Sequence, residues 1–217
     1  VCRVAPSFLR FGSYQIHALR GEKGPLERLV SHTLKTHFSH LSFEGDELLL
    51  EWLMEIVETT ASMVISWMRV GFVHGVMNTD NMSIHGLTID YGPYGWVENY
   101  DYNWTPNTTD AVSRRYIFGQ QPMIAGWNLA RLLESISPLL DEPQRLQELM
   151  GHYDTYLLDN YRRMWCGKLG LEEYDERLVS DLLTLLHRSE TDMTIFFRKL
   201  ATITEPTVGV IQDSFYD

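Results

Sequence analysis

GFVHGVMNTDNMSIHGLTIDYGPYG, residues 71–95, is the stretch on which the interpretation of this chain depends. Asp80 and Asn81 stand side by side in it, and Asp90 follows nine positions after Asn81. Turn-forming glycines and asparagines surround these three side chains, so we expect them to lie on two neighbouring loops. Because carboxylate and amide oxygens are common ligands of divalent cations, the pattern predicts a metal site.

The segment between these polar residues has the pattern of a short β-hairpin. We expect strands at 82–84 and 87–89, with a turn at His85-Gly86. A rigid hairpin would bring the flanking loops together. The alternative is that Asn78, Asp80 and Asn81 only cap turns, since Asn and Asp are frequent there for backbone reasons alone.

The sequence before this stretch predicts a long helix over 46–70. Its apolar residues recur at the three-and-four spacing of one buried stripe, and they are Leu49, Leu50, Leu53, Ile56, Val57, Val64 and Trp67. A second, amphipathic helix is predicted at 26–38. Residues 1–22 begin with an extended-looking piece that ends near Pro6, and the remainder fits either a strand or a short helix.

After the central stretch, residues 91–122 are rich in Tyr, Asn, Thr, Gly and Pro, and we expect one long irregular segment there. Helical periodicity then returns between proline and glycine breaks. The predicted helices cover about 123–137, 143–165, 171–188 and 191–202.

The composition limits the classes of partner. The 217-residue chain is 44% apolar, which favours a globular fold. Its formal net charge of -11 argues against nonspecific nucleic-acid or anionic-membrane binding, and no apolar run approaches the length of a bilayer span. The only cysteines, Cys2 and Cys166, have no zinc or disulfide spacing, so we expect a reducing compartment. The expected oligomeric state is a monomer.

Other side chains offer weaker signals, each with a structural alternative. His74 follows the long helix and could act as a base, although a structural hydrogen-bonding role is commoner at such a position. Arg3 and Arg10 have guanidinium groups suited to phosphate, whereas surface ion pairs are the alternative. The tryptophans on helical patterns, Trp52, Trp67, Trp127 and Trp165, are expected in the core rather than on a base-stacking surface.

Three ordered stretches carry a resemblance to a known family. HGVMNTDN followed by LTIDYGPYG resembles the selenoprotein O family of protein kinase-like (pseudokinase) protein adenylyltransferases. RVAPSFLRFG near the start and QQPMIAGWNLARLLESI after the irregular segment are similar to the same family, so the resemblance covers roughly residues 1–140.

The resemblance implies an α+β, protein kinase-like fold and transfer of AMP, with pyrophosphate leaving, from ATP to Ser, Thr or Tyr hydroxyls of proteins. It implies that Asp80 accepts the proton and that Asn81 and Asp90 bind Mg²⁺ (or Mn²⁺), with Asp90 also near the nucleotide. Arg3 and Arg10 match the family's two ATP-contacting arginines. ATP and protein substrates are therefore the expected partners.

One feature of the motif separates it from an ordinary protein kinase. Such a kinase has its base in H-R-D-x-x-x-x-N, and the position of that Asp is Val76 here. Transfer of the γ-phosphoryl group by the usual catalytic loop is therefore disfavoured. An ordinary phosphotransferase that uses Asp80, and a non-catalytic nucleotide-binding pseudokinase module, remain alternatives.

The resemblance also predicts a domain division and several departures from the family. We expect residues 1–22 to be a remnant of the small lobe or hinge, and 23–217 to be a mostly α-helical large lobe with 91–122 as an activation-type loop. The small-lobe Gly-rich loop, Lys and Glu are not found, which suggests a fragment, and residues 103–107 lack the cysteine of many family members. The expected compartment is the bacterial cytoplasm, or the mitochondrion for a eukaryotic protein.

Overall fold

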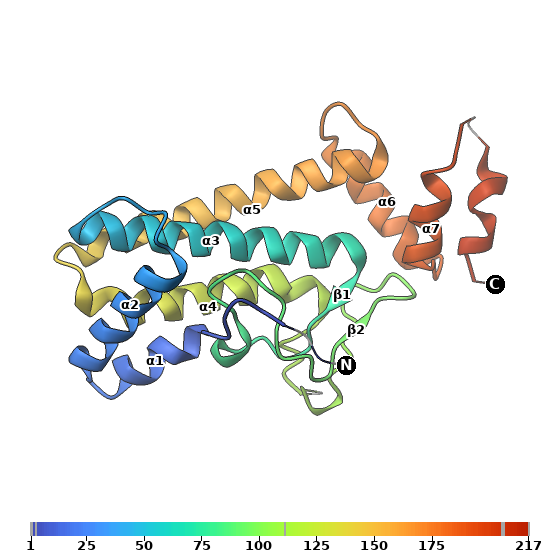
Figure 1. The fold of residues 1–217 in the computed structure, drawn as a ribbon. Coiled ribbons are helices and arrows are strands. Elements are labelled where there is room, and N and C mark those ends of the chain that lie inside the picture. Colours follow the sequence, from blue (N-terminus) through green and yellow to red (C-terminus); the bar gives the residue numbers. More distant parts are fainter. Residues whose placement is uncertain (1, 3, 111, 205–206, 217) are drawn as a thin grey trace. The chain divides into compact units, whose positions relative to one another are not determined.

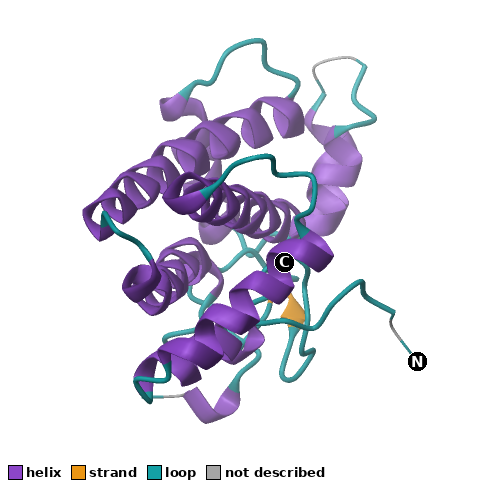
Figure 2. Cartoon of the chain, turned by 60° about the vertical axis from the view of Figure 1, so that its left-hand side comes forward, coloured by secondary structure: helices purple, strands orange, loops and turns teal. Residues whose placement is uncertain are grey.

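The structure, a computed structural model, describes residues 2, 4–110, 112–204 and 207–216. This part of the chain is mostly helical, with one small antiparallel sheet (Figures 1 and 2), as the predicted α+β class requires. The α-helices are α1 (Phe11–Leu19), α2 (Lys23–His37), α3 (Gly45–Val70), α4 (Gln121–Ile136), α5 (Leu146–Leu169), α6 (Glu176–Arg188) and α7 (Met193–Leu200). The strands are β1 (Phe72–Val73) and β2 (Gly95–Trp96).

The described residues form two compact units. The first, unit 1, is drawn from 1–64, 77–91 and 122–157, and the second, unit 2, from 65–76, 92–121 and 158–217. Both α3 and α5 contribute residues to each unit.

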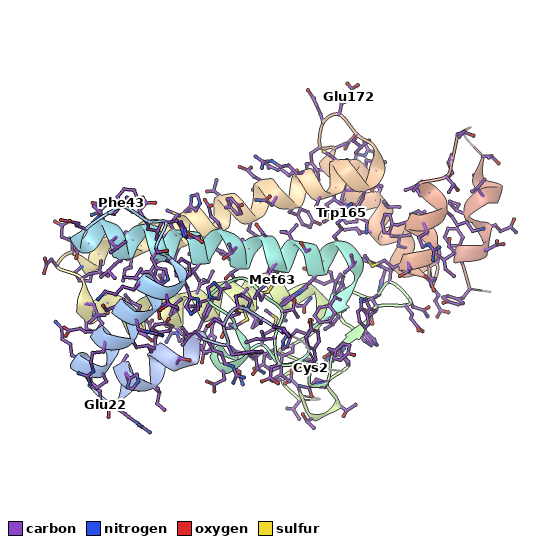
Figure 3. The ribbon with its side chains drawn as sticks, viewed as in Figure 1. Cys2, Glu22, Phe43, Met63, Trp165 and Glu172 are labelled. Carbon is purple, nitrogen blue, oxygen red and sulfur yellow. The ribbon has the colours of Figure 1, made fainter. Side chains whose placement is uncertain are left out.

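The predicted stripe of α3 forms the centre of unit 1. Leu53, Ile56 and Val57 are fully buried, and Met63 is 7% exposed (Figure 3). The first turn of α3 also organises the α4–α5 connection, because the Asp46 carboxylate accepts hydrogen bonds from the backbone N–H groups of Asp141 and Glu142. The prediction of a long buried helix at 46–70 is confirmed.

Residues 11–19, which the sequence left undecided between strand and helix, form α1. The side chain of Ser13 accepts a hydrogen bond from the backbone N–H of Arg10 at 3.2 Å, which stabilises the first turn. After α1 the chain turns sharply into α2, and Glu22 in that turn pairs with His17 at 2.8 Å (Figure 3). The two helices are joined inside the unit by a 2.7 Å hydrogen bond between the Tyr14 and Thr33 hydroxyls.

Unit 2 contains the sheet, which the sequence analysis missed. Strand β1 pairs antiparallel with β2, with Phe72 opposite Trp96. The expectation that 91–122 is irregular throughout is wrong at both ends, because β2 lies near its start and α4 begins at Gln121. Between β2 and α4 the described residues form turns, including the 3-10 turns η2 (Thr108–Asp110) and η3 (Phe118–Gln120).

The C-terminal helices α6 and α7 pack against β1 and against residues that follow β2. The helices α6 and α7 each begin where an aspartate accepts a hydrogen bond from its own first turn, Asp175 from Leu178 N–H and Asp192 from Ile195 N–H. This cap explains why α6 starts later than the predicted residue 171. The buried cluster beneath these helices consists of Val73, Val97, Tyr100, Phe118, Leu186, Met193 and Phe196.

Trp52, Trp67 and Trp165 are buried as expected, but Trp127 is 41% exposed, with the Arg131 guanidinium over its ring. Within the described residues, no helix combines the length and the apolar character needed to cross a membrane.

Candidate functional site

The N-terminal segment of unit 1 pairs with the central hairpin. The backbone N–H of Phe11 donates to the carbonyl of Met82 at 3.0 Å, and the N–H of Ile84 donates to the carbonyl of Leu9 at 3.3 Å. These two bonds flank an antiparallel bridge between Arg10 and Ser83. Arg10 is therefore held beside the segment that carries Asp80 and Asn81, although the two regions are about 70 residues apart in the sequence.

Arg10 has unused hydrogen-bonding capacity at this place. Its side chain is half-buried, and its Nε is buried without a hydrogen-bond partner among the described residues. A buried guanidinium donor without a partner is unfavourable, and an anionic ligand would satisfy it. Arg10 takes no part in the ion pairs found among the described residues, so the alternative of an ordinary surface ion pair gains no support there. Arg3 lies outside the described residues.

Asp80 and Asn81 lie in the 3-10 turn η1 (Thr79–Asn81), which packs against α1. The Thr79 hydroxyl donates to Oε1 of Gln15 in α1 at 2.6 Å. Asp80 is exposed, and its carboxylate lies so close to Gly12 that a Cβ added at position 12 would overlap its Oδ1 atom. The absence of a side chain at Gly12 thus makes room for the Asp80 carboxylate.

The predicted hairpin is present in reduced form. Met82 and Thr88 make a single antiparallel bridge, and the backbone N–H of Gly86 donates to the carbonyl of Ser83 at 3.3 Å to close the turn. The backbone of Gly86 approaches α3 closely, since a Cβ there would lie 2.6 Å from the Thr59 carbonyl oxygen. Glycine at this position lets the turn pack against α3.

Asp90 lies on the second arm of the hairpin, two residues after Thr88. It is exposed and adopts a φ of 58°, in the left-handed region that few residues other than glycine occupy. Asp80 is two residues before Met82, so both carboxylates flank the same bridge. Such a backbone conformation is uncommon and concentrates at functional sites. We call Arg10, Asp80, Asn81 and Asp90 the hairpin site.

A contact from α4 fixes the chain just before η1. The side-chain amide of Asn128 donates to the carbonyls of Met77 and Ile124 at 2.9 and 2.8 Å, and Asn128 is fully buried. This bond anchors the start of the segment that carries Asp80. The sequence analysis missed Asn128, Gln15 and Gly12 as supporting residues. The available signal was a polar residue within the apolar pattern of α4.

His74 belongs to unit 2, and its environment favours the structural interpretation. It is 1% exposed, and its ring packs 5.6 Å from that of Trp67. Its Nδ1 accepts a 3.4 Å hydrogen bond from the backbone N–H of Val76, and its own backbone N–H donates to Gln121. A side chain enclosed in this way stabilises the loop and is poorly placed to act as a general base.

The chemistry of the hairpin site suits a hard cation. Asn81 supplies an amide oxygen and Asp90 a carboxylate, both of which are ligand types that Mg²⁺ prefers. Among the described residues no three or more His, Cys, Asp or Glu side chains gather as a metal site. A site with few protein ligands is nevertheless normal for Mg²⁺, because water and substrate phosphates complete its coordination.

The ring of His85, in the hairpin turn, is packed between neighbours. It stacks on Phe38 with ring centroids 5.3 Å apart and meets the edge of His37 at 5.1 Å. Burial, with a smaller contribution from His37, lowers the pKa of His85 below its ordinary value. Protonation of His85 is therefore unfavourable in the folded hairpin.

Comparison with known proteins gives one family over almost the whole chain. The sequence model described as "Protein adenylyltransferase SelO" matches residues 1–215. A protein of Flavobacterium johnsoniae named "Protein nucleotidyltransferase YdiU" is 49% identical over 100% of this chain and 43% of its own length. Proteins of the same name from Rhodopirellula baltica and Xanthomonas campestris are 54% and 51% identical, over 94% and 100% of this chain and 39% and 43% of their own lengths. The chain thus spans about two fifths of these relatives.

Proposed function

Because the chain belongs to the protein adenylyltransferase SelO family, we propose that the complete gene product transfers AMP from ATP to Ser, Thr or Tyr hydroxyls of proteins and releases pyrophosphate. The observation that carries this proposal is the convergence of Arg10, Asp80 and Asn81 through the pairing of residues 9–11 with 82–84. The pairing supports the proposal because the backbone of Arg10 then lies next to the segment that carries Asp80 and Asn81.

In the proposed reaction the hydroxyl oxygen of the protein substrate attacks the α-phosphorus of ATP. A new oxygen–phosphorus bond forms, the bond between the α-phosphorus and the bridging oxygen breaks, and pyrophosphate takes the electron pair. Asp80 accepts the proton of the hydroxyl, as an exposed carboxylate held against α1 can do. Arg10 offsets negative charge on the phosphates.

The remaining polar residues position the nucleotide. Asn81 and Asp90 would hold Mg²⁺, which when bound neutralises phosphate charge and orients the leaving pyrophosphate. The unusual φ of Asp90 is consistent with a carboxylate directed by its backbone for such a role. Arg3 is proposed as a second phosphate ligand on the family's pattern alone.

We further propose that the chain is the large lobe of a protein kinase-like fold, with residues 1–22 as a small-lobe or hinge remnant. The order of elements supports this assignment. A long buried helix, α3, precedes the segment with Asp80 and Asn81, and a short hairpin leads to Asp90-Tyr91-Gly92. Val76, at the position of the usual kinase base, favours AMP transfer over ordinary phosphoryl transfer.

The test uses the complete gene product, a protein extract and ATP labelled on either the α- or the γ-phosphate. AMP transfer predicts that labelled protein appears with α-labelled ATP and not with γ-labelled ATP. Label from the γ-phosphate alone would establish a phosphotransferase instead. Label from neither, with ATP binding intact, would favour the non-catalytic module.

A further inference from the structure

Unit 2 contains a pocket that the proposed reaction does not use. It has a volume of about 610 Å³ and opens along the turns that follow β2. Three aromatic rings and two carboxylates line it, namely Tyr94, Trp96, Trp104, Glu98 and Asp101. No Lys, Arg or His is among the described residues that line this aromatic–acidic pocket.

Two of the rings are held in place yet remain accessible. Tyr94 and Trp96 meet edge to face with centroids 5.5 Å apart, and both pack on Phe72, at 6.0 and 5.5 Å. Phe72 is 5% exposed and fixes their positions, whereas Tyr94 and Trp96 are 41% and 52% exposed. Large aromatic surface of this kind on a soluble protein commonly marks an interaction site.

The third ring needs a glycine beneath it. A Cβ added at Gly95 would lie 2.7 Å from Cη2 of Trp104 and 3.3 Å from Cβ of Pro106. The Trp104 ring therefore rests directly on the backbone of β2. The backbone of Trp104 is itself fixed, since its N–H donates to the backbone carbonyl of Asp101 and its carbonyl accepts from the backbone N–H of Phe118.

The two carboxylates of the pocket keep capacity for a ligand. Glu98 is exposed, and no hydrogen bond or ion pair of its carboxylate occurs with the residues that the structure describes. Asp101 accepts a 2.8 Å hydrogen bond from the backbone N–H of Asn103 through Oδ1, which leaves Oδ2 available. The pocket thus combines negative charge with aromatic faces.

We propose that the aromatic–acidic pocket binds the guanidinium group of an arginine side chain from a protein partner. A planar guanidinium stacks on aromatic rings and donates forked hydrogen bonds to carboxylates, which is the combination that this pocket offers. Its volume exceeds that of one side chain, so residues that flank the arginine also fit. Within the described residues β2 pairs with β1 in a two-stranded sheet, and the pocket lies along the residues of β2 and those that follow it. The same negative charge disfavours nucleic acid.

The experiment measures peptide binding to the complete gene product by calorimetry without nucleotide. The probe is acetyl-Gly-Ser-Arg-Ser-Gly-amide, and its control replaces arginine by the neutral isostere citrulline. Saturable binding is expected for the arginine peptide, at least about 5-fold tighter than for the citrulline peptide. Because no nucleotide is present, this result is independent of the proposed AMP transfer.

Matched variants locate the binding. Glu98→Gln is expected to weaken binding of the arginine peptide by about 3-fold or more. Glu148→Gln, at an exposed site on α5, should leave this affinity unchanged. Trp96→Ala should abolish the preference for arginine, and Trp127→Ala, which removes an exposed ring of unit 1, should retain it. Equal binding of the two peptides, no saturation by about 10 mM arginine peptide, or equal affinities of Glu98→Gln and Glu148→Gln would overturn the proposal.

Discussion

The hairpin site and the aromatic–acidic pocket both draw on residues 71–95, but they are built in different ways. In the hairpin site, backbone hydrogen bonds from residues 9–11 hold the segment that carries Asp80 and Asn81. In the pocket, packed rings and a glycine under Trp104 supply the shape. In the hairpin site, backbone bonds position the segment that carries the polar side chains. In the pocket, packed aromatic rings form a binding surface together. Substitutions should therefore separate catalysis from partner binding.

The largest effect is expected from loss of the proposed metal ligand. Asp90→Ala should lower AMP transfer by about 100-fold or more, because charge on the phosphates is no longer neutralised. The rate of α-label transfer by the complete gene product measures this. Asp154→Ala, which removes an exposed carboxylate of α5, serves as the control and should retain activity. Full activity of Asp90→Ala would remove Asp90 from the site.

A smaller effect is expected at Gly12, which tests the position of Asp80. Gly12→Ala places a Cβ where the Asp80 carboxylate lies and must displace it. Transfer should fall by about 10-fold with ATP affinity little changed, since one general base contributes on this scale or above. Gly24→Ala is the matched control, because the nearest atom to its Cβ is an arginine Nη1 at 3.6 Å. Equal rates for the two variants would show that Asp80 is not held by this contact.

Substitution of Gly95, the glycine under Trp104 in the pocket, should impair peptide binding and leave AMP transfer intact. Gly95→Ala should tilt the Trp104 ring and weaken binding of the arginine peptide by about 5-fold. AMP transfer to a small hydroxyl acceptor, which does not need the pocket, should stay unchanged. Calorimetry and α-label transfer on the same preparation measure both quantities. Loss of transfer with peptide binding intact would reverse the assignment of the two regions.

The smallest effect concerns the pH dependence of stability. Burial lowers the folded-state pKa of His85 below the ordinary 6.5, so the unfolded chain binds more protons below that pH. The stability contributed by neutral His85 is thus present above pH 6.5 and is lost as pH falls through the folded-state pKa. The free energy of unfolding, measured with urea between pH 7.5 and 5.5, should fall as the pH falls, and His85→Gln should reduce this pH dependence. His32→Gln, at an exposed position, should leave the pH dependence unchanged.

The sequence predicted the long helix α3 and the short hairpin, because period and turn residues are local signals. The roles of Arg10, Asp80, Asn81 and Asp90 stay a prediction. It did not predict that Arg10 pairs with Ser83 or that Asn128 anchors Met77, since these contacts join distant segments. The strand β2 was missed because two residues carry no periodicity. The exposed position of Trp127 was missed because a helical pattern does not specify which face is covered.

The most direct test of the proposed function is the intact mass of a modified protein substrate. The complete gene product should add an adenylyl group to the substrate in the presence of Mg²⁺ and ATP, and Asp80→Asn should reduce that adduct by about 100-fold while ATP still binds. A phosphoryl adduct instead of an adenylyl adduct, or an undiminished adenylyl adduct with Asp80→Asn, would contradict the assignment of the hairpin site.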